Sequence, residues 1–172
     1  MQANFGSSRL NDLIVTLVVG VVATAVMDLW GIARKPLLGI APPDYRLLGR
    51  WLGHMAHGRF RHEAIAKALP VRGERLIGWA GHYVTGVAFA AVLLGIAGLT
   101  WIARPTLAPA LIVGVGSVAA PFLLMQPGMG MGIAGARTPR PAAVRLQSLV
   151  THVVFALGLY AAGWVARGLG LS

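Results

Sequence analysis

The chain has 172 residues, of which 56% are hydrophobic and only 12% charged, with a mean hydropathy of +0.71. Soluble domains carry about 25% charged residues, so this composition indicates an integral membrane protein. The absence of cysteine excludes disulfides, thiolate zinc sites and cysteine nucleophiles. A net charge of +10 would suggest nucleic acid in a soluble protein, but the basic loops lack interleaved aromatic residues for base stacking, so we expect no nucleic-acid partner.

Four apolar runs are each about as long as a helix needs to be to cross roughly 30 Å of hydrocarbon. The predicted spans are residues 12–33, 77–102, 107–125 and 146–166. We therefore expect an all-α membrane protein with one domain over residues 1–172, in which four transmembrane helices are joined by short amphipathic interfacial helices in a first loop, residues 34–76. Ala23-Thr24-Ala25 imitates a signal-peptide cleavage site, but the apolar run continues past it, so a retained first helix is expected.

In chain order, the first helix is expected to start near Asn11 or Asp12 and to end at about Ala33. Asp44 follows a Pro-Pro turn and can cap an amphipathic helix whose apolar face consists of Leu47, Leu48, Trp51, Leu52 and Met55. A second short helix is expected from about Phe60 to Leu69. The glycine-rich residues 126–132 predict that the third span breaks at the side of the membrane where the first loop, residues 34–76, also lies.

The basic residues are distributed unevenly between the two sides. Residues 34–76 and 126–145 hold nine and three of the 15 Lys and Arg residues, and the other side holds Arg9, Arg104 and Arg167. The positive-inside rule then places both basic loops in the cytoplasm and both termini in the periplasm. We expect the loops to contact anionic lipid headgroups of the bilayer, and homo-oligomer formation stays open.

Each span carries small or polar residues at four-residue spacing, which places them on one helix face. The stripes are Gly20, Thr24 and Asp28; Gly78, His82, Gly86 and Ala90; Ser117, Pro121 and Met125; and Ser148, His152 and Ala156. Such faces let helices approach closely in lipid. An ionisable group on such a face points into protein, and an ionisable group inside a membrane is by default a functional-site hypothesis.

The candidate ligand-binding residues lie at a similar depth near one end of the spans: Asp28, His82, Met125, Gln126 and His152. Asp28, His82, His152 and Met125 could hold a transition metal such as copper or zinc. Alternatively the two histidines could hold a b-type haem, or they could simply tie helices together. We expect a polar pocket covered by the Trp51 helix and the hairpin at residues 128–132.

A second cluster, His54, His57 and His62, lies in the first loop. The spacing of its first two members could suit zinc, but no second histidine follows His62-Glu63 at the distance that a zincin motif needs. We favour contact with lipid headgroups for this cluster.

Several strings together resemble a small bacterial inner-membrane family catalogued as domain of unknown function 2938. They are Gly20-Val-Val-Ala-Thr-Ala-Val-Met-Asp28, Gly49-Arg-Trp-Leu-Gly-His54, Gly73-Glu-Arg-Leu-Ile-Gly-Trp79, His82-Tyr83, Met125-Gln-Pro-Gly-Met-Gly130 and His152. The resemblance implies a four-helix membrane protein and no particular activity. No nucleophile with a committed base occurs in the sequence. The leading hypothesis is a non-enzymatic protein that binds or transports a small ligand or metal ion, with a structural partner subunit as an alternative.

Overall fold

The computed structural model describes residues 2–171, with side chains described for residues 9–171, and its regular elements are helical. The helices of at least 10 residues are α1 (Gln2–Leu38), α2 (Tyr45–Met55), α3 (Glu74–Ala97), α4 (Leu107–Gly116) and α6 (Pro141–Gly168). Shorter elements are α5 (Gln126–Gly128) and the single turns η1 (Ile65–Lys67), η2 (Leu99–Ala103), η3 (Pro121–Met125) and η4 (Ile133–Gly135). The expected all-α class is confirmed.

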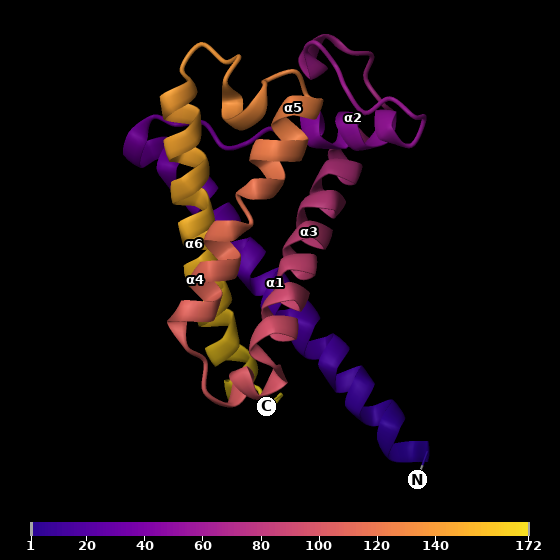
Figure 1. Cartoon of the computed structure of the whole chain (residues 1–172), viewed down its shortest axis with the longest axis vertical. Helices are drawn as coiled ribbons and strands as arrows, with labels where there is room; N and C mark the ends of the chain where they lie inside the picture. The colour runs from indigo at the N-terminus through magenta and orange to yellow at the C-terminus, as the bar shows by residue number, and fades with distance from the viewer. Residues whose placement is uncertain (1, 172) are drawn as a thin grey trace.

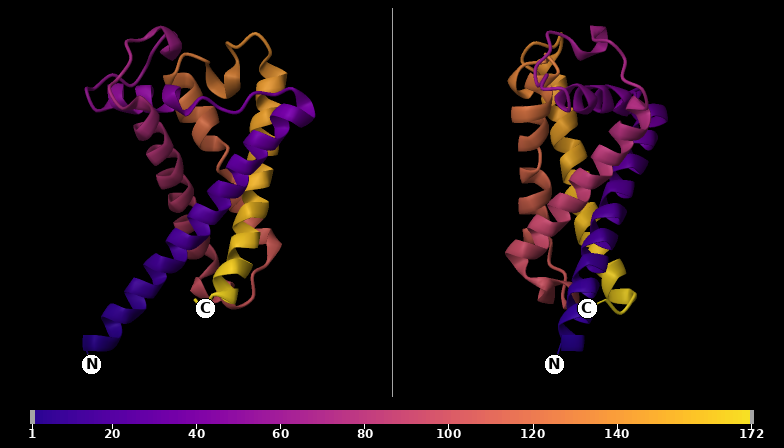
Figure 2. Two further views of the ribbon diagram at one scale, coloured as in Figure 1. Left: turned by 180° about the vertical axis from the view of Figure 1, so that it is seen from behind. Right: turned by 90° about the vertical axis from the view of Figure 1, so that its right-hand side faces the viewer.

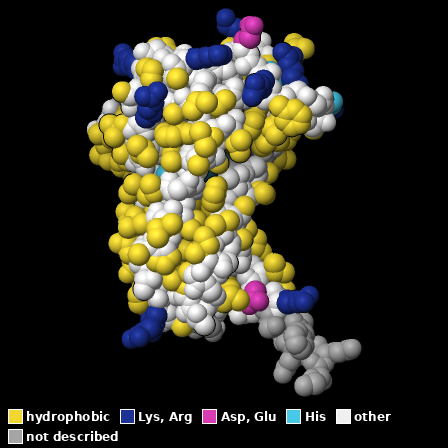
Figure 3. Space-filling model, viewed as in Figure 1, with side chains coloured by type: hydrophobic (Ala, Val, Ile, Leu, Met, Phe, Trp, Pro, Cys, Tyr) yellow, Lys and Arg dark blue, Asp and Glu magenta, His cyan; other side chains and the backbone are white. Residues whose placement is uncertain are grey.

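Four helical segments are long and apolar enough to cross a membrane: Arg9–Leu38, Glu74–Ala97, Leu107–Gly128 and Pro141–Gly168. Apolar side chains cover much of the face seen in Figure 3, and Lys and Arg side chains gather over its upper end. Large apolar side chains stay exposed along the spans, as expected where lipid replaces water. Length and composition therefore identify a membrane protein.

The spans form a bundle with two distinct ends (Figure 1). At one end, called the loop end here, α2 lies across the bundle and η1 and η4 lie nearby. The C-terminus and the start of α1 lie at the opposite end, called the terminal end, as Figure 2 also shows. The core toward the terminal end is apolar and includes Val15, Val19, Leu93, Ile102 and Leu159.

Small residues lie where the spans touch. A Cβ atom added at Gly86 of α3 would overlap Thr24 of α1, and one added at Gly20 would lie 2.5 Å from the Cα of Val87. The stripes on the first two spans therefore pack against each other. Gly114 of α4 meets Ala156 of α6 in the same way.

The predicted interfacial helix is present as α2. Asp44 caps it by accepting a hydrogen bond of 3.0 Å from the backbone N–H of Arg46. α2 packs so closely on α3 that a Cβ at Gly49 would overlap the carbonyl of Glu74, and one at Gly78 would overlap the carbonyl of Tyr45. Only glycines allow these two backbones to approach so closely.

The prediction of a second short helix from Phe60 to Leu69 is wrong, because only the turn Ile65–Lys67 is helical in this segment. Its backbone groups bond to another part of the chain instead. The N–H of His62 donates to the carbonyl of Gly128 at 2.9 Å, and that of Ile65 donates to Met129 at 3.1 Å. These long-range bonds compete with local helix formation.

α1 also begins earlier than the expected Asn11 or Asp12 and continues past Ala33 to Leu38, with Pro36 inside its last turns. Proline there removes one donor without ending the helix at once. The side chain of Arg34 donates to the carbonyl of Ala41 at 2.8 Å, which fastens the chain that leaves the helix.

The third span is interrupted earlier than its glycine-rich segment predicted. α4 ends at Gly116, and a π-helical turn, η3, follows over Pro121–Met125 before α5 continues to Gly128. Pro121 has no N–H to donate back to Ser117, which removes one bond of a regular helix. The break therefore lies within the span as well as at the glycines.

Because α2 and α3 meet at glycine, we predict that Gly78→Ala lowers the thermal stability of the purified protein, by about 1–3 kcal/mol for an overpacked contact. Gly95→Ala on the same helix is the matched control, since nothing lies within 4 Å of a Cβ there. Thermal unfolding in detergent, followed by circular dichroism, measures both. Equal melting temperatures for the two variants would contradict the close packing.

Candidate functional site

Three polar side chains from three helices meet near the loop end. The hydroxyl of Tyr45 from α2 donates to Asp28 Oδ1 from α1 at 3.0 Å. His82 Nε2 from α3 lies 3.0 Å from the same Oδ1 and 2.9 Å from the Tyr45 hydroxyl. The three atoms thus form a triangle, and we call the three residues the polar cluster.

When Asp28 is ionised, hydrogen bonding in this triangle requires a proton on Nε2 of His82. If the proton were on Nδ1 of His82, Nε2 and the Asp28 oxygen would be two acceptors facing each other at 3.0 Å. With the proton on Nε2, both the imidazole and the phenol donate to Oδ1. Two donors then stabilise one carboxylate oxygen, and bonds to a charged group are worth about 1.5–3 kcal/mol each.

Aromatic packing encloses the polar cluster. The rings of Tyr45 and His82 stack with centroids 4.3 Å apart, and Trp79 lies 4.6 Å from Tyr45. The side chains of Asp28 and His82 are each only 12% exposed. Burial, and then the charge of Asp28, raise the pKa of Tyr45, so its hydroxyl stays protonated and acts as a donor.

The two carboxylate oxygens of Asp28 differ in their hydrogen bonding. Within the described part of the chain, Oδ2 is buried and has no hydrogen-bond partner. A buried acceptor without a donor is unfavourable by about 1–3 kcal/mol. Oδ2 is therefore the oxygen that can take a further donor, either from the neighbouring side chain of Tyr83 on α3 or from a ligand.

An ion pair holds α2 in the position that lets Tyr45 reach Asp28. Arg50 on α2 bonds both carboxylate oxygens of Glu74 at the start of α3, at 2.8 and 2.9 Å. The same guanidinium donates to carbonyls of the first loop at Ala66 and Ala68. Both partners are largely buried, so the pair fixes α2, α3 and the loop together.

His152, the other predicted intramembrane histidine, makes a different contact. Its Nδ1 lies 2.7 Å from the hydroxyl of Ser117, and that hydroxyl donates to the carbonyl of Gly114 at 2.6 Å. The single hydroxyl proton is used on Gly114, so Nδ1–H of His152 donates to Ser117. The pair ties α6 to α4.

The remaining predicted ligands lie around the π-helical turn. Met125 closes the turn and is half-buried, whereas Gln126 is 3% exposed and its Oε1 has no partner among the described residues. No group of three or more His, Asp or Glu side chains that could hold a metal ion occurs in the described residues. Of the residues predicted to form one site, the structure shows a direct bond only between Asp28 and His82.

A haem bridging the two histidines would need a free ring nitrogen on each. In His82, Nε2 is already in contact with Asp28 and Tyr45, and in His152, Nδ1 is bonded to Ser117. Each imidazole thus has one partner in the protein, whereas Nδ1 of His82 and Nε2 of His152 make no hydrogen bond within the described residues.

The three loop histidines do not act as one group. His54 Nε2 donates to the carbonyl of Leu69, and His57 Nδ1 donates to that of Gly53, each at 2.9 Å. His62 is 7% exposed, its ring nitrogens lack partners in the described chain, and burial lowers its pKa. Its ring packs edge-on against His54 with centroids 4.9 Å apart.

The two segments predicted to cover the site, the Trp51 helix and the hairpin at residues 128–132, contact each other at the loop end. A Cβ at Gly128 would lie 2.6 Å from Trp51 Nε1, so the hairpin packs directly on α2. Trp51 Nε1 donates to the carbonyl of Phe60 at 3.0 Å. α2, the first loop and the hairpin thus form one layer over the bundle.

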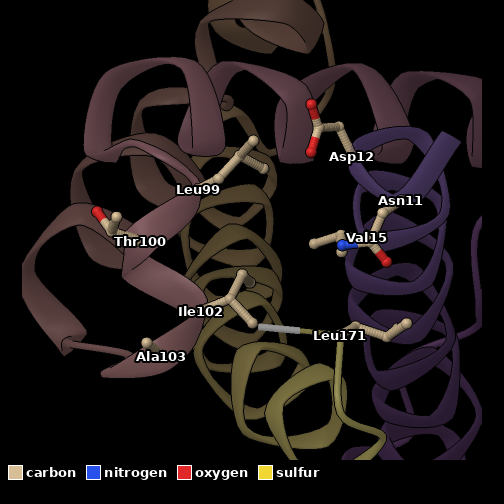
Figure 4. A pocket seen from close by; sticks show the side chains of 8 residues that line it. All are labelled: Asn11, Asp12, Val15, Leu99, Thr100, Ile102, Ala103 and Leu171. Atoms are coloured by element: carbon tan, nitrogen blue, oxygen red, sulfur yellow. The ribbon is translucent and has the colours of Figure 1, made fainter. Parts of the chain in front are cut away.

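Two surface cavities share at most one residue with the polar cluster. One, of about 270 Å³, is at the terminal end between α1, η2 and the C-terminal residues, and Figure 4 shows that its lining includes Asn11 and Asp12 beside apolar side chains. The other, of about 290 Å³, is at the loop end and has Tyr45 in its wall. Neither contains Asp28.

Sequence reasoning missed Tyr45 and the pair of Arg50 with Glu74. Tyr45 follows the predicted cap Asp44, and its position at the start of an interfacial helix gave no indication that it reaches into the bundle. The usable signal was the glycine pair Gly49 and Gly78, since close approach of α2 to α3 brings Tyr45 to the level of His82.

No curated protein and no solved structure matches the chain. Residues 17–166 match the family described as "Protein of unknown function (DUF2938)", a range that includes all four spans in whole or in part, the polar cluster and the pair of Ser117 with His152. The chain belongs to this DUF2938 family.

Proposed function

We propose that the protein is a non-enzymatic membrane protein that binds and carries a small cationic or hydrogen-donating ligand, in the simplest case a proton, at Asp28. The observation that supports this most is the asymmetry of the carboxylate. Oδ1 is within hydrogen-bond distance of both Tyr45 and His82, and Oδ2 is buried without a partner among the described residues.

The asymmetry favours an exchangeable ligand over a purely structural role. A structural ion pair in a membrane is expected to satisfy both oxygens, because an unpartnered polar atom there is costly. A proton or an N–H group on Oδ2 would remove that deficit without disturbing the Tyr45 and His82 bonds.

A metal ion remains a weaker proposal for this site. Asp28 and His82 could supply two ligands, but no third His, Asp or Glu side chain joins them among the described residues. Tyr45 is the third group at the cluster, and its raised pKa keeps it a protonated donor instead of a phenolate ligand. The donor set therefore suits a proton or an ammonium group better than copper or zinc.

We further propose that the loop end faces the cytoplasm of a bacterial cell and that both termini are periplasmic. Support comes from the 12 basic residues in the two loops at that end, against three at the other side. The ligand would then exchange with the cytoplasm beneath α2.

We predict that Asp28→Asn reduces proton flux at least about tenfold in vesicles containing the purified protein. Flux is driven by a potassium diffusion potential and followed with a pH-sensitive dye inside the vesicles. Asp12→Asn on the same helix, outside the polar cluster, should leave flux unchanged. Wild-type vesicles without protein-dependent flux, or equal flux with Asp28→Asn, would overturn the proton-carrying role.

Elemental analysis and an absorption spectrum of the purified protein separate the rival ligands. We expect metal at background level and no Soret band. Stoichiometric copper or zinc that is lost in His82→Ala would replace the proposed ligand with a metal. A Soret band that disappears in both His82→Ala and His152→Ala would establish haem.

For the orientation, a C-terminal reporter that is active only in the cytoplasm should stay silent. The same reporter inserted at the exposed turn around Gly58 in the first loop should be active. Activity at the C-terminus would reverse the proposed topology.

A further inference from the structure

The cavity at the loop end lies between the start of α2 and the first turns of α3. Its lining combines aromatic rings with ionisable side chains: Pro43, Asp44, Tyr45, Arg46, Arg75 and Trp79. Its volume of about 290 Å³ is large enough for a group of several heavy atoms. The polar cluster does not fill it, since only Tyr45 belongs to both.

The charges in this lining do not balance. Asp44 is matched by Arg46, whose guanidinium bonds its two oxygens at 2.8 and 3.0 Å, and this contact lowers the pKa of Asp44. Arg75 has no carboxylate partner within the described residues, because its neighbour Glu74 is paired with Arg50. The cavity therefore has one positive charge in excess and attracts an anion.

The depth of the cavity relative to the membrane indicates which kind of anion it attracts. Trp79, 38% exposed, lies in the second turn of a membrane-spanning helix, and Trp and Tyr are enriched where spans meet lipid headgroups. Immediately after Arg75 the helix becomes apolar, and Leu76 is 75% exposed. A ligand at this level would have its charged group beside Arg75 and its apolar part along the spans.

The cavity at the terminal end provides a contrast within the same molecule. It has a similar volume, but its only ionisable lining residue is Asp12, and no arginine contributes to it. The two cavities differ in charge, and only the one at the loop end offers a cation and an aromatic ring to an anion.

We propose that the loop-end cavity binds the phosphate headgroup of an anionic phospholipid. Arg75 is the anchor and Arg46 a second contact, and the indole N–H of Trp79, which has no acceptor within the described chain, donates to the headgroup. This site goes beyond the function proposed for Asp28 and does not depend on it. Because Tyr45 separates the cavity from Asp28, a bound headgroup would pack against one wall of the polar cluster.

The test uses the full-length protein in detergent and short-chain phosphatidylglycerol as the probe, with phosphatidylcholine and inorganic phosphate for comparison. Isothermal titration measures binding, and the emission of Trp79, identified by subtraction of the Trp79→Phe variant, reports its location. We expect phosphatidylglycerol to bind, phosphatidylcholine to bind at least about tenfold more weakly, and inorganic phosphate to have little effect.

Arg75→Gln should weaken phosphatidylglycerol binding about tenfold, whereas the matched control Arg72→Gln, which removes the same charge three residues away, should not. Both variants should show the thermal stability of the unmodified protein in the absence of lipid. Equal losses for the two variants would show nonspecific charge attraction and overturn the site. Equal binding of inorganic phosphate, or no change in Trp79 emission, would overturn the assignment to a lipid.

Discussion

A carboxylate within an apolar helix needs donors from elsewhere in the fold, and in this protein two helices provide them. Asp28 of α1 accepts from His82 of α3 and from Tyr45 of α2. An unpaired Asp in a membrane helix is unfavourable, by about 2.5–3.5 kcal/mol at the helix centre, and Asp28 lies nearer the loop end. The position of α2 across the bundle is thus inseparable from the presence of Asp28, since without α2 the carboxylate would lose one of its two donors.

The glycines make this arrangement possible. α1 and α3 touch at Thr24 and Gly86, one helical turn from Asp28 and His82, so the distance between the two ionisable groups is set by a contact with almost no side chain. Gly49 and Gly78 then bring α2 onto α3, and the pair of Arg50 with Glu74 fixes it there. The close helix contacts bring Asp28, Tyr45 and His82 together, and the hydrogen bonds among these side chains offset the cost of burying them.

Much of this could be predicted from the sequence, and the reasons for success and failure are physical. Hydropathy revealed the spans because membrane helices are selected for apolar length, and four-residue spacing revealed the face shared by Gly20, Thr24 and Asp28. The loop from Phe60 to Leu69 could not be predicted, because its backbone bonds to Gly128 and Met129, more than 60 residues away. The partner of His152, Ser117, could not be predicted either, because depth along a helix can be counted from the sequence but the rotation of the helix against its neighbours cannot.

The π-helical turn in the third span has a consequence for how insertions and deletions act on this protein. A π turn bonds each N–H to the fifth residue back, as Gln126 does to Pro121, and so accommodates one residue more than an α turn. Loss of a single residue between 121 and 125 would therefore convert the π turn into an α turn, and the residues beyond it would keep nearly the same orientation. Loss of a single residue from a regular α-helix such as α6 would instead rotate everything beyond it by about 100°. The π turn is thus the place in the spans where a change of chain length by one residue disturbs the burial of Gln126 and the contact of the hairpin with Trp51 least.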